Sequence, residues 1–256
     1  MSGSLADRTV LVTRPRPQAE ELSALLRRRG ARVVEAPTIR LEPPPPGGPL
    51  DGAVADAAAG GFAWVVFTSA AGVAAWAERA AAVGADGPRA RVAAVGSGTA
   101  EALRRTGISA DLVPERFTTE ALAAAFPEGT GRVLLPRADL AAADLEDGIR
   151  RRGWDPVRVD AYRTAFEQAL PGEARRALDE GRVDAVTFTS ASTVEGFRRL
   201  AGAVRGPAVV CIGPVTAQAA REAGFEVDAM ADPHTVEGLV EAVARALEGR
   251  PGPGGD

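Results

Sequence analysis

The sequence contains an internal duplication, and this feature constrains the fold more than any other. Three blocks recur in the same order at a spacing of about 120 residues: residues 63–73 in 184–194, residues 91–107 in 208–224 and residues 9–37 in 132–160. The alignment puts Gly96 on Gly213 and Arg14 on Arg137. A unit of this length is too long for a solenoid repeat, so we predict a pair of related folding units.

Each block has the same form, a short apolar run followed by helical sequence rich in Ala, Arg and Glu. Nearly continuous apolar runs are typical of strands that are covered on both faces. Their alternation with helices indicates parallel α/β units, and we predict about ten strands, five in each copy. The six clearest strands are Val10–Thr13, Trp64–Phe67, Val92–Val95, Val133–Leu135, Ala185–Phe188 and Val209–Ile212.

The composition excludes several kinds of chemistry. All thirty positive charges are arginines, which rules out a Schiff-base lysine, pyridoxal chemistry and a P-loop lysine. With one histidine, His234, and one cysteine, Cys211, the chain can build neither a Cys/His zinc site nor an intramolecular disulfide. We expect His234 at a helix start and Cys211 in the core of a strand.

The chain has the character of a soluble protein without a nucleic-acid or membrane partner. Its net charge is only −4, and no apolar signal core precedes Asp7. Residues 57–77 are uncharged, but their glycines and Ser69 favour strand, turn and helix over a membrane span. The single cysteine fits a reducing cytoplasm, so we expect a cytoplasmic protein, with residues 249–256 as a flexible tail. Residues 41–52, rich in Pro and Gly, are predicted to continue neither a strand nor a helix.

The carboxyl ends of the predicted strands are the place to look for a ligand site, because open parallel sheets bind ligands there. These ends carry hydroxylated or small residues and two arginines, at predicted helix starts where free N–H groups favour an anion. They are Thr13-Arg14, Thr68-Ser69, Ser97-Gly98-Thr99, Pro136-Arg137, Thr189-Ser190 and Val215-Thr216. Each Ser or Thr alone fits a plain N-cap, but the whole row indicates a polyanion held between two lobes. The Gly96-x-Gly98 pair lacks the third glycine of a dinucleotide fingerprint.

Seven segments, in order, resemble the uroporphyrinogen-III synthase family. They are VLVTRP (10–15), FTSAAGV (67–73), AVGSGTA (94–100), LLPRAD (134–139) with VDAYRT (159–164), FTSASTV (188–194) and CIGPVTA (211–217). The resemblance runs from about Thr9 to Leu247, and the ordered set is specific although no single motif is. It implies a hydro-lyase that closes hydroxymethylbilane to uroporphyrinogen III with inversion of ring D, in haem, sirohaem and cobalamin biosynthesis.

The resemblance also implies how this reaction runs. It implies no metal and no cofactor, loss of the terminal hydroxyl, and a spiro intermediate that fragments and recloses. The eight carboxylates of the substrate suit the row of helix starts, and we expect a monomer. Tyr162, the only tyrosine, lies where no apolar face demands it, and the resemblance makes it the candidate catalytic residue that assists departure of the hydroxyl. The candidate substrate-binding residues are Thr13, Arg14, Ser69, Ser97, Gly98, Thr99, Arg137, Ser190, Val215 and Thr216.

The duplication alone leaves two domain arrangements open, because one domain per half and an interlaced pair both give five strands per lobe. The resemblance implies the interlaced arrangement, in which residues 1–36 and 167–256 form one lobe and residues 44–159 form the other. Residues 37–43 and 160–166 are then two linker strands. Each lobe is expected to be an α/β domain, a five-stranded parallel sheet flanked by helices in the flavodoxin-like manner.

Two further functions remain open. A two-lobed module can hold an anion without chemistry, although the missing signal sequence argues against the periplasmic kind. A regulatory protein can keep the tetrapyrrole cleft as a sensor, although no DNA-binding segment is apparent. Incubation with hydroxymethylbilane distinguishes both from an enzyme, since only an enzyme yields uroporphyrinogen III.

Overall fold

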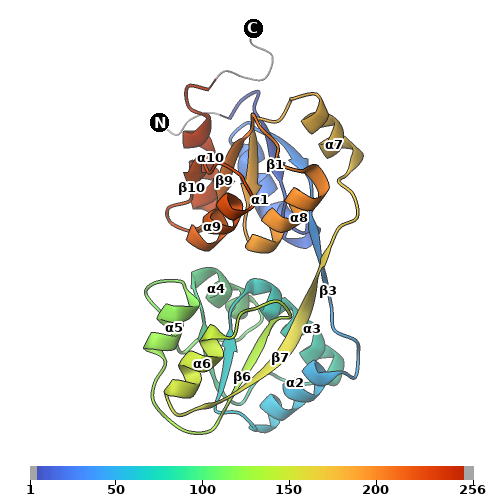
Figure 1. Ribbon diagram of the computed structural model, residues 1–256. Coiled ribbons are helices and arrows are strands. Elements are labelled where there is room, and N and C mark those ends of the chain that lie inside the picture. The colour runs from blue at the N-terminus through green and yellow to red at the C-terminus, as the bar shows by residue number, and fades with distance from the viewer. Residues whose placement is uncertain (1–4, 251–256) are drawn as a thin grey trace. The chain divides into compact units, whose positions relative to one another are not determined.

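The computed structural model describes residues 5–250, and the chain divides into two compact units (Figure 1). The first unit combines Met1–Arg40 with Ala165–Asp256, and the second is Leu41–Thr164. The chain therefore leaves the first unit, builds the second and returns. The predicted flexible tail lies, from residue 251 onward, outside the described residues.

The first unit is built on a five-stranded sheet with the order β2-β1-β8-β9-β10. Its strands are β1 (Thr9–Val12), β2 (Arg32–Glu35), β8 (Ala185–Phe188), β9 (Ala208–Cys211) and β10 (Ala229–Met230). Neighbouring strands pair in parallel throughout. Helices α1 (Arg16–Arg28) and α10 (Val236–Leu247) pack on one face. Helices α7 (Gly172–Asp179), α8 (Ala191–Ala201) and α9 (Pro214–Glu222) pack on the other.

The second unit has a five-stranded sheet with the order β3-β7-β6-β4-β5. Its strands are β3 (Ile39–Glu42), β4 (Trp64–Phe67), β5 (Arg91–Ala94), β6 (Arg132–Ala138) and β7 (Asp155–Phe166). The pairs β4–β5, β4–β6 and β6–β7 are parallel. Helices α2 (Pro49–Ala59), α3 (Ala70–Val83) and α4 (Ser97–Arg105) cover one face, and α5 (Thr119–Ala125) and α6 (Asp144–Arg151) the other.

The central strands are mostly apolar because both faces of each sheet are covered. In β1, Val10 and Val12 face the α1–α10 side, whereas Leu11 faces the side of α7, α8 and α9. In β4, Val65 and Phe67 pack under α2 and α3, and Val66 packs under α5 and α6. This alternation over continuous apolar runs is the pattern of doubly covered parallel strands.

The duplication is visible in matching hydrogen bonds. The backbone N–H of Val92 donates to the carboxylate of Asp111 at 2.7 Å, and the N–H of Val209 donates to Asp228 at 2.8 Å. The threonines that follow these segments, Thr118 and Thr235, cap the N-termini of α5 and α10 in the same way. The two copies are therefore structural as well as sequence equivalents.

The strands predicted from the sequence are largely confirmed, whereas the prediction for the connector at residues 41–52 contains an error. Ten strands form two sheets of five within the described residues, and β4 and β8 have their predicted bounds. Residues 57–77 form helix end, strand and helix start, as expected. The prediction that residues 41–52 continue no helix is wrong, because α2 begins at Pro49. A proline is tolerated in the first turn, where its missing N–H would have no helical acceptor.

We predict that a fragment comprising Leu41–Thr164 unfolds cooperatively by itself, because it carries all five strands of its sheet and both helix layers. Far-UV circular dichroism during a urea titration measures this transition. A fragment ending at residue 127 lacks β6 and β7 from one sheet and β8 to β10 from the other. It should therefore show no cooperative transition, and cooperative folding of that shorter fragment would contradict the interlaced arrangement.

Candidate active site

Each sheet contains two adjacent strands whose following connections lead to opposite sides of the sheet. In the first unit β1 leads to β2 on one side, and the adjacent β8 leads to β9 on the other. In the second unit β4 leads to β5, and the adjacent β6 leads to β7 on the opposite side. Open α/β sheets bind ligands outside the carboxyl ends of such strands. The candidate site residues are therefore expected at the carboxyl ends of β1 and β8, and of β4 and β6.

Arg14, directly after β1, is a half-buried cation without a partner among the described residues. Its Nε and Nη1 atoms are buried with no hydrogen bond, and no ion pair to it occurs among residues 5–250. Burial lowers the pKa of the Arg14 guanidinium below its usual value, and the negative charge of Glu21 partly offsets this effect. Buried N–H donors without acceptors are costly, so this group is suited to receive a carboxylate.

Thr13 and Ser190 have internal hydrogen bonds at the same edge. Thr13 has no exposed surface, and its hydroxyl donates to the Thr187 carbonyl in β8 at 2.7 Å. Ser190 is the N-cap of α8, and its Oγ accepts from the Thr193 N–H at 3.2 Å. The Thr13 side chain thus belongs to the sheet, while Ser190 sets the start of a helix whose first N–H groups point beyond the edge.

Ser69 and Tyr162 come together at the corresponding edge of the second unit. Ser69 caps α3 by accepting from the Gly72 N–H at 3.0 Å, and its Oγ lies 3.2 Å from the Tyr162 Oη. Tyr162, in β7, is half-buried and packs against the apolar cluster beneath α2, α3 and α4. The expectation that no apolar face demands this tyrosine is therefore wrong, because its ring packs on this cluster while its hydroxyl lies beside Ser69.

Arg137, the counterpart of Arg14, has a partner that Arg14 lacks. It lies at 6% exposure and donates to the Glu146 carboxylate at 2.5 Å and to the Ala142 carbonyl at 2.7 Å. Glu146, on α6, is equally buried. The two equivalent arginines thus differ, since one is neutralised inside the protein and the other is not. Sequence reasoning missed Glu146, which lies nine residues after Arg137 and aligns with Ser23 in the other copy.

The starts of α4 and α9 present free backbone donors. Both helices have a glycine N-cap without a side-chain cap, and their first helical bonds come from Ala100 and Ala217. The N–H groups of the preceding first turns, which contain Ser97, Gly98, Thr99, Val215 and Thr216, therefore have no helical acceptor. The side chains of Thr99 and Thr216 are buried, at 6% and 4% exposure. These helix starts therefore offer a ligand backbone donors in place of threonine hydroxyls.

The remaining single residues have structural surroundings. His234 Nδ1 lies 2.7 Å from the Ala231 carbonyl and precedes Thr235, the N-cap of α10, as expected for a helix start. Cys211 is buried in β9, and burial raises the pKa of its thiol to about 12. Cys211 is therefore a core residue and no nucleophile at neutral pH.

A cavity of about 380 Å³ in the first unit lies at the opposite, amino-terminal end of its strands. Its walls include Asp184, Arg205 and Arg250. Asp184 already pairs with Arg8 at 2.9 Å, and Arg250 pairs with Asp228 at 2.8 Å. Over residues 5–250 no three metal-ligating side chains cluster, and no helix is long and apolar enough to cross a bilayer. The carboxyl edges thus remain the candidate site.

Comparisons with known proteins agree with one another. A family model described as Uroporphyrinogen-III synthase HemD matches residues 20–241. The chain is 33% identical to the uroporphyrinogen-III synthase of Synechococcus elongatus, over 93% of this chain and 95% of that protein. It is 31% identical to the porphyrin biosynthesis protein HemD of Ruminiclostridium josui, over 91% of this chain but 47% of that protein.

Solved structures that resemble this chain carry related names. A mutant uroporphyrinogen III synthase of Thermus thermophilus matches with a TM-score of 0.66 and 25% identity, over 95% of this chain and 100% of that one. The uroporphyrinogen-III synthetase of Helicobacter pylori, at 17% identity and a TM-score of 0.62, shares the fold. With a family model spanning most of its length and a relative matched nearly end to end, the chain belongs to the uroporphyrinogen-III synthase family.

Proposed function

We propose that this protein is a uroporphyrinogen-III synthase, which closes hydroxymethylbilane to uroporphyrinogen III with loss of water and inversion of ring D. Its family membership supports the activity. The single structural observation that carries the proposal is the half-buried Arg14 at the carboxyl edge, whose buried Nε and Nη1 atoms have no partner among the described residues. A substrate with eight carboxylates supplies the acceptor that the protein lacks.

We propose that the carboxylates bind at the carboxyl edges of both sheets. Arg14 takes one of them, and the N–H groups at the starts of α3, α4, α8 and α9 take others. This assigns contacts to Ser69, Ser97, Gly98, Thr99, Ser190, Val215 and Thr216, chiefly through their backbone. Thr13 and Arg137 then shape these edges from within, through Thr187 and Glu146. The strand order β2-β1-β8-β9-β10 supports a flavodoxin-like unit, whose ligand sits outside the carboxyl ends of two such strands.

Positioning can account for most of the catalysis that this reaction needs. Unaided closure gives the symmetric isomer, and a thousandfold redirection corresponds to roughly 4 kcal/mol at ~1.4 kcal/mol per tenfold. Orienting a bound substrate supplies that much. The terminal C–O bond breaks as the pyrrole nitrogen donates electrons, and the hydroxyl leaves as water once it gains a proton. We assign the hydrogen bond that assists this departure to the Tyr162 hydroxyl, with Ser69 as its neighbour at 3.2 Å.

Incubation with hydroxymethylbilane tests the function. Chromatography separates the isomers, and isomer III in excess over spontaneous isomer I is the expected result. A protein that binds the bilane but leaves only isomer I is a binding or sensing module instead. We further propose that the enzyme works as a cytoplasmic monomer, in line with its reduced cysteine and its complete sheets.

Arg14→Gln and Arg137→Gln form a matched pair: the first should impair substrate binding, and the second should impair the stability of the fold. Arg14→Gln should raise KM by roughly 10- to 100-fold, because a charge-assisted hydrogen bond contributes about 1.5–3 kcal/mol, and should leave the melting temperature unchanged. Arg137→Gln leaves Glu146 buried without its cation and should destabilise the fold by about 3–5 kcal/mol. Steady-state kinetics and thermal melts measure both. Equal destabilisation without a KM change in Arg14→Gln would make that arginine structural.

Thr99→Val and Thr216→Val should each change turnover by less than about tenfold, because the buried side chains leave binding to backbone donors. The isosteric change removes the hydroxyl and keeps the volume. Activity and melting temperature are compared with those of the wild type. Abolished turnover in a folded variant would show that the hydroxyl itself binds substrate.

Tyr162→Phe should lower kcat by roughly tenfold or more. The loss should lie toward the low end of the ~10²–10⁴-fold typical of general acid–base assistance, or below it, because the pyrrole nitrogen already drives the departure. The phenylalanine keeps the ring packing, so the melting temperature should not move and isomer III should still dominate. Ser69→Ala serves as the companion variant, since it removes the neighbouring hydroxyl and a helix cap. Normal turnover in Tyr162→Phe together with a lower melting temperature in Tyr162→Ala would reduce Tyr162 to a packing role.

A further inference from the structure

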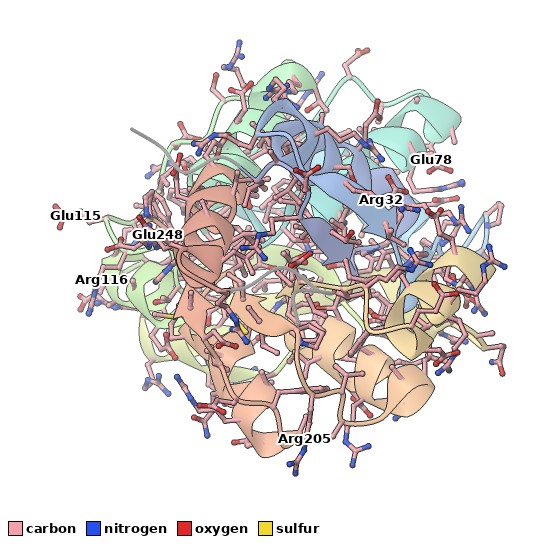
Figure 2. The ribbon with its side chains drawn as sticks, turned by 90° about the horizontal axis from the view of Figure 1, so that it is seen from above. Arg32, Glu78, Glu115, Arg116, Arg205 and Glu248 are labelled. Carbon is pink, nitrogen blue, oxygen red and sulfur yellow. The ribbon has the colours of Figure 1, made fainter. Side chains whose placement is uncertain are left out.

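Phe117 is an exposed aromatic residue in a firmly held segment. Its exposure is 47%, and the two residues before it, Glu115 and Arg116, point their charged side chains into solvent (Figure 2). The segment is anchored on β5, where Asp111 accepts from the Val92 N–H at 2.7 Å and the Leu112 carbonyl accepts from the Ala94 N–H at 2.9 Å. Immediately after Phe117, Thr118 caps α5. The ring is therefore displayed at a defined place.

The Phe117 ring lies against the glycine that begins α4. A Cβ atom on Gly96 would come within 2.8 Å of Phe117 Cγ and 2.9 Å of its Cβ, which is closer than atoms can pack. The φ angle of Gly96 is −168°, an extended conformation that any residue adopts. The glycine is thus required by the ring and not by the backbone. The ring lies beside the first turn of α4, whose N–H groups have no helical acceptor.

The second copy of the duplication repeats this arrangement. Phe117 aligns with His234 at the same offset that aligns Gly96 with Gly213. The His234 ring packs over Gly213, where an added Cβ would lie 3.6 Å from its Cγ, and Gly213 has a φ of −173°. The ring is held by the contact of its Nδ1 with the Ala231 carbonyl. Both copies have kept a flat ring over a helix-start glycine, although one ring is apolar and the other polar.

We propose that Phe117 is a substrate-contacting residue that sets affinity, by stacking on a pyrrole ring whose carboxylate arms reach the N–H groups of α4. His234 has the equivalent position at α9. An isolated exposed phenylalanine needs no explanation, but a ring kept in both copies beside free N–H donors matches a flat heteroaromatic ring with acidic side chains. Aromatic rings stack with a specific geometry beyond simple burial. The inference rests on the proposed function and adds a contact that no polar group supplies.

The test compares Phe117→Ala with Phe117→Trp and with a control, Val83→Ala. Val83 is exposed to 38% at the last position of α3, away from the carboxyl edge. Phe117→Ala should raise KM for hydroxymethylbilane, and the inhibition constant of uroporphyrinogen III, by roughly five- to tenfold. Its kcat should stay within about twofold and its melting temperature unchanged, because exposed positions contribute little stability. Phe117→Trp should restore KM, and Val83→Ala should behave as the wild type.

Three outcomes would overturn the inference, and the measurements distinguish them. An unchanged KM in Phe117→Ala, with the wild type active, means that the ring only covers the glycine and leaves the proposed function intact. A wild type that makes no uroporphyrinogen III overturns the function and the inference with it. A raised KM in both Phe117→Ala and Phe117→Trp also counts against stacking, because the tryptophan keeps an aromatic face.

Discussion

In each unit the central strands are buried on both faces, and this double coverage decides where a ligand can bind. Helices occupy both sides of each sheet, so the backbone of the central strands reaches solvent only at the strand ends. At the carboxyl ends the chain turns into helices whose first N–H groups have no acceptor. The apolar packing that stabilises the fold thus also creates its anion-binding positions.

The two copies of the duplication have kept their scaffold and changed their site residues. Asp111 and Asp228 make the same backbone contact, and Ser69 and Ser190 cap equivalent helices. By contrast, Arg14 has no counterpart to Glu146. A linear substrate has two chemically different ends, and two identical edges could not tell them apart. Under the proposed function, the divergence between the copies orients the substrate.

The contrast between the two arginines explains why an arginine at a strand end is an ambiguous signal. Arg14 lies just after β1 and Arg137 lies near the end of β6, and both aligned as candidate substrate contacts. A buried charge needs a partner, but that partner can come from the protein or from the ligand. Glu146 supplies it for Arg137 from the next helix. For Arg14 the equivalent helix carries Ser23 at the aligned position. Under the proposed function, a substrate carboxylate is the partner of Arg14.

The sequence by itself determined the strands, the duplication and the helix starts. Continuous apolar runs, capping residues and the offset between copies are local or pairwise signals, and β4 and β8 fell on their predicted bounds. Tertiary structure alone decided which polar groups are already satisfied. The contacts Arg137–Glu146, Ser69–Tyr162 and Phe117–Gly96 join different elements. No residue pattern records them, because packing in three dimensions sets the distance between side chains on separate strands, helices and loops.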